Sequence, residues 1–161
     1  MRLGKVLTLL VAVVCQTASA QSLNVLNINE DDSGAVCGSS APQIEVLVTG
    51  VRAEGLLTVE LYKPSQRDFL RKTSRLKRIR VPAQEGAQTV CFNIEAAGTY
   101  AVAAYHDVDG DRKLARQWNK LPAEPFALSN NQTLQLRMPK FEDAAFKAGE
   151  QTTRVRLDLR R

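Results

Sequence analysis

Short runs of alternating residues make up most of this 161-residue chain. In the clearest run, Ile44, Val46 and Val48 occupy every second position. A period of two places these apolar side chains on one face of a strand and the residues between them on the other. The pattern recurs between turns that contain Gly or Pro. It predicts seven strands, at residues 43–49, 56–62, 76–81, 89–94, 99–105, 133–138 and 153–159.

Seven short strands without a long helix predict an all-β fold, an antiparallel β-sandwich of the immunoglobulin-like or transthyretin-like type. The hairpin-like spacing of the strands favours this fold over a parallel α/β sheet. Residues 141–148 could form one helical turn or irregular chain. We therefore expect one β-sandwich domain over residues 43–161, preceded by a flexible leader over residues 21–42.

The first twenty residues have the pattern of a secretory signal peptide. Arg2 and Lys5 precede an uncharged run of about ten residues, and Ala18-Ser19-Ala20 fits the cleavage pattern. This run is too short to span a bilayer, and no later stretch approaches the required length of about 20 residues. We expect cleavage after Ala20, export to the periplasm or the medium, and no transmembrane segment in the mature chain. The alternative is lipid attachment at Cys15, before which Val14 is a poor residue.

Cleavage changes both the charge and the cysteine count. The whole chain has 22 Lys and Arg, 17 Asp and Glu, and three cysteines. Without residues 1–20 the charge falls from +5 to 20 − 17 = +3, and Cys37 and Cys91 remain. Export places them in an oxidising compartment, which favours a Cys37–Cys91 disulfide over two unpaired buried thiols.

An acidic segment after the fifth predicted strand resembles a calcium loop of the EF-hand type. It offers oxygen ligands at positions 1, 3, 5 and 7, from Asp107, Asp109, Asp111 and the backbone carbonyl of Lys113. Ca²⁺ prefers six to eight oxygen ligands. However, Arg112 stands where the loop needs Gly, and Trp118 where it needs a bidentate Glu. The segment is therefore either a Ca²⁺ site or an acidic turn that closes a hairpin.

Several further motifs accompany this loop. They are Gly98-Thr99-Tyr100-Ala101-Val102, His106-Asp107, Asp109-Gly110-Asp111 with Lys113-Leu114, Pro122-x-Glu124, Phe126, Ser129-Asn130-Asn131 and the later Phe141-Glu142-Asp143-Ala144-Ala145-Phe146. Together they resemble DUF2141, a domain-of-unknown-function family of exported bacterial proteins, from about Gln43 to the C-terminus. That family usually has Gly in place of Arg112 and Asp in place of Ala115, which weakens the calcium hypothesis here. The resemblance implies an exported β-sandwich and brings no established activity.

The polar residues of segment 106–131 are the main candidates for a binding function. They are His106, Trp118, Glu124, Ser129, Asn130 and Asn131. His106 is the only histidine, which excludes a multi-histidine zinc site. We expect it to order the loop through hydrogen bonds. Acid–base catalysis by His106 and Asp107 is disfavoured because neighbouring strand residues point to opposite faces. Trp118 could either cap the sandwich or anchor a ligand.

A second candidate is the basic stretch at residues 67–80, which has seven cationic residues against Asp68, a net +6. Its proposed anion-binding residues are Arg71, Lys72, Arg75, Lys77, Arg78 and Arg80. The simpler interpretation is an edge strand whose charges prevent edge-to-edge pairing. Nucleic acid is disfavoured as a partner because Phe69 is the only aromatic residue among the charges.

The sequence thus favours a non-enzymatic binding or accessory module of the bacterial cell envelope, with a functional loop at 106–131 that Ca²⁺ could support. Its partner would be an unidentified envelope ligand or protein. One alternative is an anion-binding protein that uses residues 67–80. The other is a small enzyme with His106 and Asp107 in its site.

Overall fold

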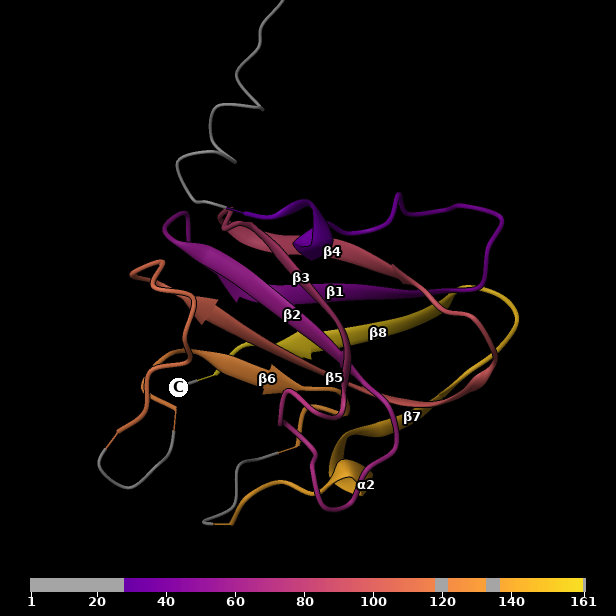
Figure 1. The fold of residues 1–161 in the computed structure, drawn as a ribbon. Helices are drawn as coiled ribbons and strands as arrows, with labels where there is room; N and C mark the ends of the chain where they lie inside the picture. Colours follow the sequence, from indigo (N-terminus) through magenta and orange to yellow (C-terminus); the bar gives the residue numbers. More distant parts are fainter. Residues whose placement is uncertain (1–27, 118–121, 133–136, 161) are drawn as a thin grey trace, which may run out of the picture.

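The computed structural model describes residues 28–117, 122–132 and 137–160. These residues form eight strands, a single 3-10 turn and a single α-helical turn (Figure 1). In chain order the elements are η1 (Glu30–Asp32), β1 (Gln43–Val51), β2 (Leu56–Tyr62), β3 (Arg75–Pro82), β4 (Gly86–Asn93), β5 (Gly98–Asp107), β6 (Phe126–Leu128), α2 (Phe141–Ala144), β7 (Ala145–Ala148) and β8 (Thr153–Asp158). Neither helix is long or apolar enough to cross a membrane.

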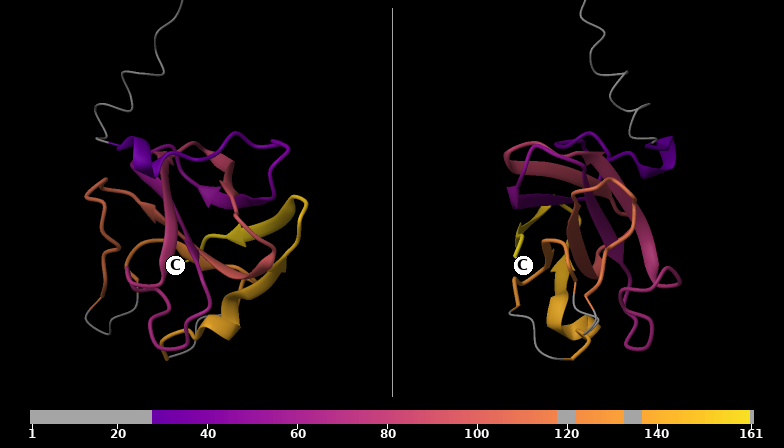
Figure 2. Two further views of the ribbon diagram at one scale, coloured as in Figure 1. Left: turned by 45° about the vertical axis from the view of Figure 1, so that its right-hand side comes forward. Right: turned by 90° about the vertical axis from the view of Figure 1, so that its left-hand side faces the viewer.

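The strands form two sheets that pack face to face (Figure 2). The first sheet has three strands in the order β4-β1-β8, and the second has the order β3-β2-β5-β6, with β7 also paired to β5. The alternating residues of β1 face inward, and Ile44, Val46 and Val48 are fully buried. They meet Leu57 and Val59 from β2 in the main hydrophobic core. Burial of alternate apolar residues from both sheets is what makes this sequence a β-sandwich.

The all-β sandwich is therefore confirmed, and six of the seven predicted strands correspond to β1, β2, β3, β4, β5 and β8. The seventh, at 133–138, falls mainly outside the described residues. The structure adds two short strands, β6 and β7, which share the second edge of β5. It also pairs β8 with β1 in parallel, the one departure from antiparallel pairing among the strands of the described residues. Because β8 arrives from β7 in the other sheet, no hairpin dictates its direction.

A second apolar cluster covers part of the outer face of the five-stranded sheet. Phe69, from the connection between β2 and β3, packs edge-on against Tyr62 with ring centroids 5.4 Å apart and against Phe141 of α2 at 5.7 Å. That connection and α2 lie together at the bottom of Figure 1. The apolar cluster occupies this end of the sheet, and charged residues such as Glu60, Arg78 and Arg80 lie beyond it on the same face.

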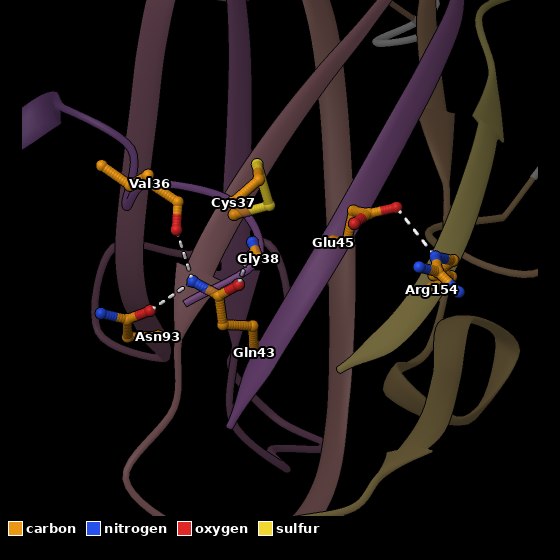
Figure 3. The surroundings of a disulfide bond; sticks show 8 residues. Val36, Cys37, Gly38, Gln43, Glu45, Asn93 and Arg154 are labelled. Carbon is orange, nitrogen blue, oxygen red and sulfur yellow. Dashed lines mark hydrogen bonds and ion pairs between the residues drawn. A yellow bond between two sulfur atoms is a disulfide. The ribbon is translucent and has the colours of Figure 1, made fainter. Parts of the chain in front are cut away.

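The segment before β1 is fixed to the first sheet. The disulfide joins Cys37 to the fully buried Cys91 of β4, with 5.3 Å between their α-carbons. Gln43 is also fully buried, and its side chain donates to the carbonyl of Val36 and to Oδ1 of Asn93, at 2.8 and 2.7 Å (Figure 3). These contacts hold residues 35–43 against β4.

Candidate ligand-binding cleft and acidic loop

The basic stretch places its arginines on the outer face of the five-stranded sheet. In β3 the inward position belongs to Ile79, so Arg78 and Arg80 on either side of it point outward. Both pair with the buried Asp32 of η1, Arg78 through two bonds of 2.9 and 3.1 Å and Arg80 through one of 2.8 Å. Arg75 pairs with Glu60 of β2 at 2.6 Å. The three guanidinium groups are thereby fixed in position above the sheet.

A cleft of about 630 Å³ lies over this face. Its floor comes from β2, β3, β5 and β6. Its walls come from Leu70 and Lys72, from the segment between β5 and β6, and from residues 137–139. Eight of the lining residues are cationic: Lys72, Arg75, Arg78, Arg80, Arg112, Lys113, Arg116 and Arg137. The cleft therefore unites two stretches that the sequence presents as separate candidates.

The lining is strongly positive. Among the lining residues that the structure describes, only Glu60 and Asp111 are acidic, so eight cationic side chains against two leave a net +6. Two further acids lie behind the lining as ion-pair partners of Arg80 and Arg137. One is Asp32, and the other is Asp143. The pairing with Arg137 lowers the pKa of Asp143 to about 2, so this pair stays ionised at neutral pH.

Aromatic side chains supply the apolar part of the floor. Tyr62, Tyr105 and Phe126 line the cleft together with Leu128. Burial raises the pKa of Tyr62, and its hydroxyl group donates a hydrogen bond to Glu60. Burial also raises the pKa of Tyr105. Both phenols therefore remain neutral, and the floor presents rings and hydroxyl groups beneath a positive rim.

Arg80 is the most deeply placed cation of the cleft, with only 6% of its surface exposed. Its Nη1 donates to Asp32 and its Nη2 donates to the carbonyl of Arg112 at 3.2 Å. Its Nε is buried and has no hydrogen-bond partner among the described residues. An arginine with one unused donor at the base of a positive cleft is suited to an anionic group.

Two of the proposed anion-binding residues of the basic stretch do not line the cleft. Arg71 and Lys77 are exposed and lie outside the lining of the cleft. Lys77 belongs to β3, which is an edge strand of its sheet as the simpler interpretation expected. The cations of the basic stretch are thus divided, because some line the cleft while Lys77 lies on a sheet edge.

The acidic loop begins where β5 ends. Asp107 is fully buried, and its Oδ2 accepts a hydrogen bond from the backbone N–H of Arg112 at 2.7 Å. Asp109 accepts from the backbone of Asp111 at 3.1 Å, and Asp111 accepts from that of Lys113 at 2.7 Å. Arg112 has a φ of +65°, so it adopts the left-handed conformation for which the loop pattern prefers Gly. The turn therefore forms despite the substitution.

The loop brings Asp107 and Asp109 together with Glu124, and not with Asp111. One carboxylate oxygen from each of the three lies within 4.8 Å of the others. Glu124 is 7% exposed and accepts hydrogen bonds from the backbone of Val108 at 3.0 Å and of Ala115 at 3.1 Å. Burial raises the pKa of Asp107, and the neighbouring charge of Glu124 raises it further. Asp111 and Lys113, the other two predicted ligands, instead contribute to the lining of the cleft.

Three of the other polar candidates form hydrogen bonds that join neighbouring segments of the sandwich. Ser129 is fully buried, its hydroxyl accepts from the backbone of Val102 at 2.9 Å, and it donates to the carbonyl of Ala144. Asn130 donates to the carbonyl of Ala145 at 3.0 Å, and Asn131 joins β8 by accepting from the backbone of Asp158 at 2.8 Å. Trp118 lies outside the described residues.

His106 lies on the face opposite Asp107. It is fully buried on the inner face of the sheet, near the C-terminal end of β5. Its Nε2 is 2.7 Å from the carbonyl oxygen of Glu54. Because a carbonyl only accepts, this nitrogen carries the hydrogen. Its Nδ1 is buried without a partner among the described residues. His106 thus ties the β1–β2 turn to β5, and it does not line the cleft.

These observations define the class of protein: a small all-β sandwich with a basic cleft on the outer face of one sheet. Within that class, the chain belongs to the family described as "Uncharacterized protein conserved in bacteria (DUF2141)", whose model matches residues 46–156. The match spans every strand from β2 to β7 and most of β1 and β8. No curated protein and no solved structure matches the chain.

Proposed function

We propose that this protein is an exported, non-enzymatic binding protein of the bacterial cell envelope that holds an organic anion in the basic cleft. The observation that carries the proposal is the convergence of eight cationic side chains over an aromatic floor. Export is supported by the signal-peptide pattern of residues 1–20 and by the disulfide between Cys37 and Cys91, because such bonds persist in oxidising compartments.

The shape and chemistry of the cleft favour a small amphiphilic anion. Its volume of about 630 Å³ falls within the usual range for small-molecule sites, roughly 300–1,000 Å³. Tyr62, Tyr105 and Phe126 offer contact area to an apolar body. The guanidinium groups above them offer planar donors that suit a carboxylate, sulfonate or phosphate group. Arg80 lies deepest among these donors, and its Nε makes no hydrogen bond among the described residues.

Two fluorescent probes test this proposal. Anilinonaphthalenesulfonate carries an aromatic body and a sulfonate, whereas phenylnaphthylamine has the same aromatic core without the charge. We expect the sulfonate probe to bind the folded chain at one saturable site, and the neutral probe to bind at least about tenfold more weakly. A roughly tenfold increase in ionic strength should weaken the sulfonate probe further, because salt screens the exposed cations.

A pair of double variants separates the cleft from the overall charge. Lys72→Gln with Lys113→Gln removes two exposed cations from the lining, whereas Arg71→Gln with Lys77→Gln removes two exposed cations outside it. The first pair should weaken sulfonate binding about tenfold, and the second should leave it nearly unchanged. Equal effects of the two pairs, or no saturable binding by the unaltered chain, would refute the proposal.

A further inference from the structure

Two carboxylates are buried side by side where the acidic loop begins and ends. Asp107 closes β5 and is fully buried, and Glu124 precedes β6 with 7% of its surface exposed. Asp109 completes the group from the exposed side, with all three ligand oxygens within 4.8 Å of one another. Burial of like charges so close together is unfavourable unless a cation or a proton neutralises them.

The hydrogen bonds that reach these carboxylates come from backbone N–H groups. Those of Val108 and Ala115 reach the two oxygens of Glu124, and that of Arg112 reaches Oδ2 of Asp107. The other oxygen of Asp107, Oδ1, is buried and has no hydrogen-bond partner among the described residues. A buried carboxylate oxygen without a donor is rare in folded proteins and calls for an explanation. It belongs to the same side chain that joins Asp109 and Glu124 in the group.

We infer that Asp107, Asp109 and Glu124 form a site for a hard divalent cation, with Ca²⁺ as the best fit. Two oxygens that ligate one Ca²⁺ at about 2.4 Å are at most about 4.8 Å apart. The three carboxylate oxygens all lie within that limit of one another, so one cation can reach all three. The group contains only carboxylates, and oxygen ligands select Ca²⁺ or Mg²⁺ over Zn²⁺ or Cu²⁺. Its outer side is open at Asp109, so water can complete the six to eight ligands that Ca²⁺ takes.

This site differs from a contiguous calcium loop. The third carboxylate comes from Glu124, seventeen positions after Asp107, and not from Asp111. The cation would therefore join the two ends of the loop. A ligand set within residues 107–113 would stabilise only the first turn of the loop. Asp111 meanwhile accepts from the backbone of Lys113 and lines the cleft.

The experiment compares thermal melts and calorimetric titrations of the full disulfide-bonded chain with Ca²⁺, with Mg²⁺ and with a chelator. We expect Ca²⁺ in hundredfold excess over its Kd to raise the Tm by about 5 °C or more relative to chelator. Mg²⁺ should give a smaller shift, because it demands a stricter octahedral geometry. No Tm shift and no heat of binding at about 10 mM Ca²⁺ would overturn the inference, because known sites bind more tightly than that.

Two conservative variants test the ligand set. Asp109→Asn removes a charge from the group but keeps the oxygen that accepts from Asp111, and Asp111→Asn likewise keeps its bond from Lys113. We expect the first to weaken Ca²⁺ binding at least about tenfold and the second to change it less than about threefold. Glu124→Gln provides a second loss-of-ligand variant. Equal losses from Asp109→Asn and Asp111→Asn would instead support a contiguous loop and contradict the proposed ligand set.

Discussion

Gly55 shows how closely two backbones approach beside the acidic loop. It has a φ of +68°, and a β-carbon added there would lie 2.0 Å from the carbonyl oxygen of Asp107 and 2.6 Å from that of Val108. Both values are far below van der Waals contact, and both neighbours are backbone atoms that no rotamer change can move. The turn between β1 and β2 therefore depends on Gly at this position, as does the direction in which the chain leaves β5.

Gly55→Ala should lower the free energy of unfolding by about 3 kcal/mol. The loss is expected because alanine is strained in the left-handed conformation and because its β-carbon would overlap the backbone of residues 107 and 108. The matched control is Gly38→Ala, with a φ of +79° and nothing within 4 Å of the added carbon. Gly38→Ala introduces only the left-handed strain, without an overlap, and should lower the free energy of unfolding by about 1 kcal/mol. Urea denaturation of both variants measures the difference. Similar losses would mean that the chain around 107–108 relaxes freely.

At the scale of elements, period-two alternation was enough to predict most strands but not their neighbours. Ile44, Val46 and Val48 face the core because every second residue of β1 is apolar. By contrast, β6 is three residues long, too short to display any period. The parallel pairing of β8 with β1 depends on the path of the chain between the sheets, which local alternation does not encode. Short edge strands and crossovers are therefore the features that sequence patterns miss.

The disulfide is the covalent link between the segment before β1 and the sandwich. Cys37→Ser should lower the free energy of unfolding by about 2–4 kcal/mol, because the bond closes a loop over a sequence separation of 54 residues in the unfolded chain. The fold should persist, since Gln43 still holds Val36 and Asn93 by hydrogen bonds (Figure 3).

Urea denaturation with and without a thiol reductant checks this prediction. The reductant should lower the unfolding midpoint of the unaltered chain and leave that of Cys37→Ser unchanged. A reductant-insensitive midpoint in the unaltered chain would show that the bond does not contribute to stability. The variant also provides the control for any effect of the reductant on the rest of the molecule.

At the scale of the whole molecule, the candidate site could be predicted only in parts. The sequence singled out the basic stretch and the acidic loop because each is a local excess of one charge. It could not show that Arg80 and Arg112 meet, because this contact joins positions 32 residues apart. Glu124 was identified as a polar loop residue, but its place beside Asp107 follows from how the loop returns to β6. Long-range convergence of this kind is fixed by the fold and not by local pattern.

The two proposed sites share one loop, so their ligands should be coupled. Residues 111–114 and Arg116 lie between Asp109 and Glu124 in the chain and form part of the wall of the cleft. Within them, the carbonyl of Arg112 accepts from Arg80 on the cleft floor. A cation that joins the ends of the loop would hold these walls in place, which lowers the ordering cost of binding an anion. It would also add positive charge near the cleft.

We therefore expect saturating Ca²⁺ to lower the Kd of anilinonaphthalenesulfonate about fivefold or more, and the probe to lower the Kd of Ca²⁺ by the same factor, because linkage is reciprocal. Fluorescence titrations at fixed Ca²⁺ and calorimetry at fixed probe measure the two factors. Asp109→Asn should bind the probe as the Ca²⁺-free chain does at the Ca²⁺ concentration that saturates the unaltered chain, and should respond only at about tenfold higher Ca²⁺ or more. Probe binding that is tight but indifferent to Ca²⁺ in the unaltered chain would mean that the walls are already ordered without the cation, and that the cleft and the carboxylate group act independently.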